Sequence, residues 1–165
     1  MKRKQYIVFG ALALLLLLSK RVKAETIIKE FEGEELDAYL DPAGIPTIGY
    51  GTTRNPDTGK KIKIGDKIDK ATALRWLRMD TEKIRDSVKK KIKVPINARQ
   101  LDALTSFVYN VGPTAFADST MLKLINNKID KRIVANEFDK WVYAKGKKLP
   151  GLVRRRKLEK ELFLS

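Results

Sequence analysis

The sequence predicts an α+β domain in which a small sheet near the N-terminus is followed by helices. Between residues 38 and 63, short apolar runs are broken by the pairs Asp-Pro, Ala-Gly, Asn-Pro and Thr-Gly, which is typical of an antiparallel sheet. Beyond residue 69, apolar residues recur at intervals of three and four, which is typical of amphipathic helices. With 165 residues, 43% of them hydrophobic, the chain is long enough to bury the core of one domain.

The first helix is expected just before the sheet, over residues 25–31. Ile27, Ile28 and Phe31 fall on one face of that stretch at helical spacing. The chain then changes to the strand pattern that ends near residue 63, so the first helix leads directly into the sheet.

Capping residues and apolar stripes predict the later helices. Asp69 is expected to cap a long helix over residues 70–91. Asn97 and Gln100 form a capping pair for the next helix, which Gly112 and the proline after it should end. The remaining helices are expected over residues 121–125, 131–143 with Asp130 as the cap, and 150–163.

The composition excludes several kinds of chemistry. The chain contains no His and no Cys, so a Ser-His-Asp or Cys-His nucleophile system is impossible in its usual form. Catalytic zinc depends mostly on His or Cys ligands, and no disulfide can form. Carboxylates, Lys and Tyr remain for acid–base work, and we expect neither a metal nor a cofactor.

The chain is strongly basic, with a net charge of +15. Residues 1–24 contribute +6, and the other residues hold 29 basic and 20 acidic side chains. A basic surface favours polyanions such as anionic lipid, acidic polymers of the cell envelope or nucleic acid. A solvated basic face without a specific partner is the alternative.

Residues 1–24 are read as a membrane anchor or signal segment, and residues 25–165 as one folded domain. An apolar run from Tyr6 to Leu18 lies between clusters of Lys and Arg. About 13 residues at about 1.5 Å each reach only about 20 Å, so spanning a bilayer needs thinning or snorkelling. The alternatives are a cleaved export signal, with the cut after Ala24, and a buried core helix. We expect an uncleaved anchor, because the segment after the apolar run is unusually basic for a signal peptide.

A glutamate, an aspartate and a threonine lie at fixed spacing around the predicted hairpin: Glu32, Asp41 and Thr47. Two carboxylates on neighbouring elements facing one cleft are the minimum equipment for cleaving a glycosidic bond. Each has a plainer explanation, since Glu32 stands in an acidic run, Asp41 precedes a proline in a turn, and Thr47 suits a strand.

These residues lie within motifs that resemble the phage-type lysozymes of glycoside hydrolase family 24. The resemblance rests on Glu32-Gly33, on the Tyr-Leu-Asp that ends at Asp41, and on GIPTIGYG from residue 44 to 51. It continues in SFVYNVG at residues 106–112 and in the WVYAK and GLVRRR segments near the C-terminus, and it covers about residues 25–165. It implies a lysozyme-like fold, with a small sheet lobe beside a mostly helical lobe.

The resemblance also implies roles for single residues. Glu32 is expected to be the general acid, while Asp41 and Thr47 hold the attacking water and stabilise positive charge on the sugar. Asn110 and Arg155 are expected at the substrate-binding site: Asn110 bonds the sugar's amide groups, and Arg155 pairs with Glu32.

The sequence departs from the family pattern at two positions. Thr52 stands where many members carry His, and Arg154 stands where Asn is common. If the family's His only braces the cleft, its replacement by Thr52 should change little. With Arg154 in place of Asn, the sequence does not predict how side chains pack near Glu32.

The function expected is a muramidase, which cleaves the β-1,4 bond between N-acetylmuramic acid and N-acetylglucosamine in peptidoglycan. The expected catalytic domain is monomeric and binds no nucleic acid. It acts at the host inner membrane facing the periplasm or at a viral membrane, in lysis or in entry. A lytic transglycosylase, a non-catalytic membrane-anchored virion protein and a basic nucleic-acid-binding module are the alternatives.

Overall fold

The computed structural model describes residues 23–41 and 43–165. The apolar run expected to form an anchor lies outside the described residues. The elements, in order, are α2 (Ala24–Glu32), β1 (Glu35–Leu40), β2 (Pro46–Gly49), α3 (Lys70–Lys91), α4 (Ala98–Val111), α5 (Pro113–Asp118), α6 (Thr120–Asn126), α7 (Lys131–Asn136), η1 (Glu137–Lys140), β3 (Tyr143–Ala144), β4 (Lys147–Lys148) and α8 (Pro150–Leu164). Among the described residues, none of the helices is both long and apolar enough to cross a bilayer.

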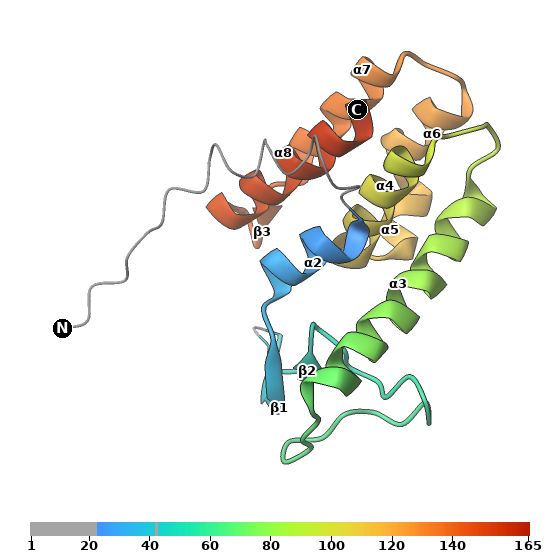
Figure 1. Cartoon of the computed structure of the whole chain (residues 1–165). Coiled ribbons are helices and arrows are strands. Elements are labelled where there is room, and N and C mark those ends of the chain that lie inside the picture. The colour runs from blue at the N-terminus through green and yellow to red at the C-terminus, as the bar shows by residue number, and fades with distance from the viewer. Residues whose placement is uncertain (1–22, 42) are drawn as a thin grey trace.

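The molecule has two parts, as the sequence predicts. The β1–β2 hairpin and the loop that follows it form one end, and the helices from α4 to α8 gather at the other (Figure 1). Helix α3 runs from the sheet end to the helical end, and α2 leads into β1 (Figure 1). The predicted α+β architecture is therefore confirmed, with two small antiparallel hairpins and mostly helix.

Helix α4 forms the centre of the helical part, and every residue from 101 to 108 is buried. The ring of Phe107 meets Phe138 and Trp141 edge to face, at centroid distances of 5.3 Å in both pairs. Edge-to-face contacts place the positive edge of one ring on the negative face of another. These contacts hold η1 and the residue after it against the buried α4.

The predicted caps are present. The side chain of Asp69 accepts from the Thr72 amide at 2.7 Å, and Asn97 forms a capping box with Gln100. The side chain of Asp130 accepts from the Arg132 amide at 2.8 Å. Short polar side chains before an apolar stripe therefore predicted these helix starts correctly.

Two predicted elements are wrong in extent. The expected helix over residues 131–143 ends at Asn136, and after η1 the chain turns into the β3–β4 hairpin. Lys145 and Gly146 both have positive φ there, 49° and 75°, which makes a tight two-residue turn. The expected strands up to residue 63 stop at Gly49, and between Gly49 and Lys67 the chain forms only isolated bridges. The predicted break at Gly112 is also the start of α5, because Pro113 takes the first helical position.

Candidate active site

Glu32 is the last residue of α2 and lies where the helical part meets the hairpin. Ile27 and Ile28 are buried and fix the helix, and Gly33 ends it with a φ of 75°. The side chain of Glu32 remains 25% exposed. Its position at the helix end therefore leaves the carboxyl accessible to a substrate.

Arg155 of α8 forms an ion pair with Glu32 from the buried side of the carboxyl. Its Nη1 donates to Glu32 Oε1 at 2.6 Å, and its side chain is only 2% exposed. Its Nη2 donates to the Ser106 carbonyl at 3.2 Å, and its Nε donates to Glu159 Oε1 at 3.1 Å. All three nitrogens are thus held by the protein, so Arg155 fixes the orientation of Glu32 and is not exposed to contact a sugar.

Glu159 lies fully buried beneath Arg155. Its Oε1 also accepts from Ser106 Oγ at 2.7 Å, and its Oε2 accepts from Arg156. Burial raises the pKa of the Glu159 carboxyl, and the two guanidiniums oppose that rise. The result is a compact network of opposite charges that begins at Glu32 and extends into the core.

Arg156 connects the same network to Asn110. It donates to Asn110 Oδ1 through Nη2 and to the Trp141 carbonyl through Nε at 3.1 Å, and it lies over the Phe107 ring. Burial lowers the pKa of Arg156. Asn110 itself is exposed at the last turn of α4, so its Nδ2 group remains at the surface while its Oδ1 accepts from Arg156.

Gly51 and Tyr109 line the other side of the glutamate. A side chain added at Gly51 would begin 3.7 Å from Glu32 Oε2 and 3.8 Å from the Tyr109 ring, and its φ of 94° strains any residue but glycine. The hydroxyl of Tyr109 donates to the Tyr50 carbonyl at 2.7 Å, which ties α4 to the chain after β2. Burial raises the pKa of Tyr109, and the charges of Asp80 and Glu32 add to this. Gly51 therefore leaves room for the oxygen of Glu32 that Arg155 does not bind.

Asp41 directly follows β1 at the turn of the hairpin. Its Oδ1 accepts from the amides of Ala43 and Ile45 at 2.8 and 2.9 Å, and its own amide donates to the Ile45 carbonyl at 3.1 Å. Asp41 therefore stabilises the turn, as its position before a proline predicts, and the same hydrogen bonds fix the orientation of its carboxylate. Both side-chain bonds go to Oδ1.

Thr47 of β2 is buried at 3% exposure, and its hydroxyl donates to the Ile45 carbonyl at 2.9 Å. The backbone of Ile45 therefore joins Asp41 and Thr47. Tyr39 pairs with Thr47 across the hairpin. The pKa of the Tyr39 phenol is raised by burial first and then by the charges of Glu32, Glu35 and Asp41. The negative charges of both candidate catalytic carboxylates therefore disfavour ionisation of the Tyr39 phenol.

The position where many family members carry His is occupied by the buried Thr52. Its hydroxyl donates to Asp80 Oδ2 at 3.3 Å. Burial raises the pKa of Asp80, while Lys83 and Thr52 oppose that rise. A hydrogen bond from Thr52 to a carboxyl on α3 therefore occupies the position of the family's His. Arg154, the other departure, is exposed on α8 and lies outside the buried network.

The structure brings Glu32 and Arg155 into direct contact and links Asp41 to Thr47, while Asn110 joins the network through Arg156. Sequence reasoning missed Glu159. Its positions four and three residues after the two arginines were the available signal, because helical residues at those spacings are neighbours. Among the described residues, no group of His, Cys, Asp and Glu side chains could hold a metal ion.

A two-part α+β domain with a glutamate at the end of its first helix, an ion-paired arginine beneath it and an aspartate on the adjoining hairpin has the equipment of a glycoside hydrolase. Residues 29–159 match the phage lysozyme family model. The chain belongs to the phage lysozyme family.

Individual proteins agree with this assignment. The endolysin of Acyrthosiphon pisum secondary endosymbiont phage 1 is 43% identical over 147 residues, which cover 87% of this chain and 96% of that protein. The SAR-endolysin of bacteriophage PS34 is 35% identical over 133 residues, covering 81% of this chain and 76% of that protein.

Solved structures show the same fold. An endolysin from Escherichia coli O157:H7 phage FAHEc1 superposes with a TM-score of 0.77 at 44% identity, covering 88% of this chain and 92% of that one. The muramidase domain of SpmX from Asticaccaulis excentricus superposes with a TM-score of 0.72 at 32% identity, covering 86% of this chain and 95% of that domain.

Proposed function

We propose that this chain is a muramidase that hydrolyses the β-1,4 bond between N-acetylmuramic acid and N-acetylglucosamine in peptidoglycan, in phage lysis of the host. One observation carries the proposal. The carboxyl of Glu32 is held by Arg155 at 2.6 Å yet stays partly exposed beside the hairpin that bears Asp41 and Thr47. Similarity to endolysins and to a muramidase domain supports the same reaction.

Glu32 acts as the general acid and donates its proton to the glycosidic oxygen as the bond to C1 breaks. Because Arg155 binds Oε1, the proton leaves from Oε2, on the side kept open by Gly51. The carboxylate that remains is stabilised by the guanidinium, which cannot be deprotonated near neutral pH. Arg155 is therefore a positioning residue, held in turn by Glu159 and Ser106.

Asp41 and Thr47 handle the water. The carboxylate of Asp41 stabilises the positive charge that develops on the sugar ring, and together with the Thr47 hydroxyl it holds the water that attacks C1. Their common anchor, the backbone of Ile45, keeps the two groups in fixed relative positions. With water as the acceptor, the product carries a reducing muramic acid end.

We also propose that residues 1–24 hold the enzyme at a membrane, with the catalytic domain acting on the wall beyond it. The apolar run between basic clusters supports this, and so does the likeness to SAR-endolysins. The net positive charge of residues 25–165 would favour anionic envelope polymers as secondary partners.

Mass spectrometry of purified peptidoglycan digested by the full chain tests the reaction. The proposal expects reducing muramic acid ends. A product set dominated by 1,6-anhydro ends would show an intramolecular acceptor and a lytic transglycosylase, and no cleavage at all would show a non-catalytic member of the family.

A further inference from the structure

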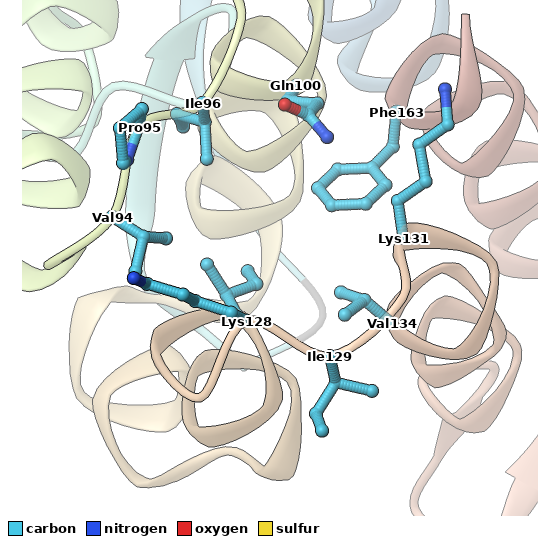
Figure 2. Close-up of a pocket in the computed structure, with 10 residues that line it drawn as sticks. Val94, Pro95, Ile96, Gln100, Lys128, Ile129, Lys131, Val134 and Phe163 are labelled. Carbon is cyan, nitrogen blue, oxygen red and sulfur yellow. The ribbon is translucent and has the colours of Figure 1, made fainter.

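An apolar hollow of about 420 Å³ lies at the helical end of the molecule, away from the active site. It is enclosed by the loop before α4, the turn between α6 and α7, and the end of α8 (Figure 2). The apolar residues lining it are Val94, Pro95, Ile96, Ile125, Ile129, Val134 and Phe163. Its volume is within the range of pockets that bind ligands, which makes it a candidate contact site.

Two lysines line the hollow from opposite sides (Figure 2). Lys131 donates from Nζ to the Leu164 carbonyl at 2.6 Å, which holds its side chain across the end of α8. Lys128 stands on the other side, and both lysines are exposed. Ile129 lies between them in the chain and is 39% exposed, so one apolar side chain at the hollow is open to solvent.

The backbone of Lys128 is strained. Its φ is 56°, and helix α6 ends there with the Lys128 amide donating to the Ile125 carbonyl and the Ile129 amide donating to the Leu124 carbonyl. This ending normally places glycine at the left-handed position. A lysine at that position keeps a charge beside the hollow at a cost in backbone energy.

The surface around the hollow is also strongly basic. Residues 87–101, which include the loop that lines the hollow, contain five basic side chains and no acidic one; four of the five are exposed, and Lys89 pairs with Asp86 at 3.6 Å. Residues 119–133 contain four basic side chains and one acidic, Asp130, whose carboxylate binds the neighbouring Arg132. The two stretches of chain that contribute most of the hollow's lining therefore carry an excess of positive charge.

From this arrangement we infer that the helical end of the catalytic domain docks on the surface of an anionic lipid bilayer. Ile129 and the hollow take up apolar contact with the acyl region, while Lys128, Lys131 and the surrounding cations bind the headgroup phosphates. Shallow apolar contact combined with cations is the pattern by which proteins lie on anionic membranes.

The orientation agrees with the rest of the molecule. Helix α2 ends at Glu32, where the helical part meets the hairpin, and the chain then enters β1 at the sheet end (Figure 1). The hollow and the hairpin with Asp41 therefore lie toward opposite ends of the domain (Figure 1). Docking through the hollow directs the hairpin that carries Asp41 away from the lipid. The docking does not depend on which bond the enzyme cleaves.

Because the chain has no cysteine, single labels can test the docking in the full chain. A polarity-sensitive fluorophore is placed on Ile129→Cys, and a matched one on Ile64→Cys, which is 59% exposed on the sheet side. Both proteins are reconstituted with vesicles of phosphatidylcholine alone or mixed with phosphatidylglycerol. The label at position 129 should report an apolar environment only with the anionic lipid, and the label at 64 should not respond.

Charge variants of the labelled protein separate this face from general attraction. Lys128→Gln with Lys131→Gln is compared with Lys60→Gln with Lys61→Gln, exposed lysines on the sheet side that give the same net charge. Each lysine near an anionic surface raises the equilibrium constant for binding that surface about fivefold. The first pair of substitutions should therefore lower the equilibrium constant for docking about 30-fold, and the second pair should hardly change it. Equal effects of the two pairs, equal responses of the two labels, or a response to a soluble polyanion without vesicles would overturn the inference.

Discussion

Glu159→Gln is the substitution that most severely tests the buried network. Glu159 is fully buried and accepts from Arg155, Arg156 and Ser106. Glutamine keeps the shape but removes the negative charge, so two buried guanidiniums lose their common partner. Breaking a buried ion pair by removing one partner costs about 3–5 kcal/mol.

For a domain of this size, each kcal/mol corresponds to about 3 °C of melting temperature, so the variant should melt about 10–15 °C lower. Thermal unfolding of the full chain, followed by circular dichroism, measures this. The matched control is Glu161→Gln on the same helix, where the side chain is 38% exposed and lies 4.0 Å from Lys157. Exposed pairs contribute about 0–1 kcal/mol, so the control should hardly move.

The same variant should lose activity below its melting temperature, because Arg155 loses the bond that fixes its Nε while it holds Glu32. Equal melting temperatures for the two glutamine variants would refute the reasoning. They would mean that Glu159 carries a proton in the folded protein and that the arginines are held by neutral acceptors.

Two further changes test local features. The pKa of Asp57 is lowered to about 2 by Arg75 and by the Trp76 indole, so the stability it contributes is present above its unfolded value and is lost as the pH falls through about 2. Acid unfolding followed by circular dichroism should therefore show a shallower loss between about pH 4 and pH 2 for Asp57→Asn, and an unchanged slope would contradict the assignment. Lys128→Gly should raise the free energy of unfolding by about 1 kcal/mol in urea denaturation, since only glycine adopts its positive φ without strain, whereas Asn127→Gly next to it, at a φ of −88°, should not stabilise.

Much of the fold follows from the sequence because its signals are local. Asp69 and Asn97 predict helix starts because each side chain accepts a hydrogen bond from the backbone amide three residues further on. The helix expected up to residue 143 ends earlier because its end depends on contacts with residues distant in the sequence. Apolar residues continue past Asn136 with helical spacing, but Phe138 packs on Phe107 from the short 3-10 helix η1, and Trp141 packs on it from just after that helix. Periodicity alone does not distinguish these cases.

The site was predictable in part. Motif spacing placed Glu32 and Asp41 on neighbouring elements, and the resemblance paired Arg155 with Glu32. Burial was not predictable: Arg155 was expected among the substrate-binding residues, and the structure holds it beneath Glu32 with its nitrogens engaged. Glu159 was missed because a glutamate in a charged helix usually faces solvent, and only the packing of α8 on α4 buries it.

Glu32→Gln in the full chain is the most direct test of the central claim that this carboxyl is the general acid. The variant keeps a hydrogen-bonding side chain beside Arg155, and its melting temperature reports whether the fold is retained. Glu30→Gln, an exposed position on the same helix, serves as the control. Release of soluble fragments from purified peptidoglycan should fall at least about 100-fold for Glu32→Gln and stay at the wild-type rate for Glu30→Gln. A folded Glu32→Gln protein that cleaves within about tenfold of the wild-type rate would contradict the account.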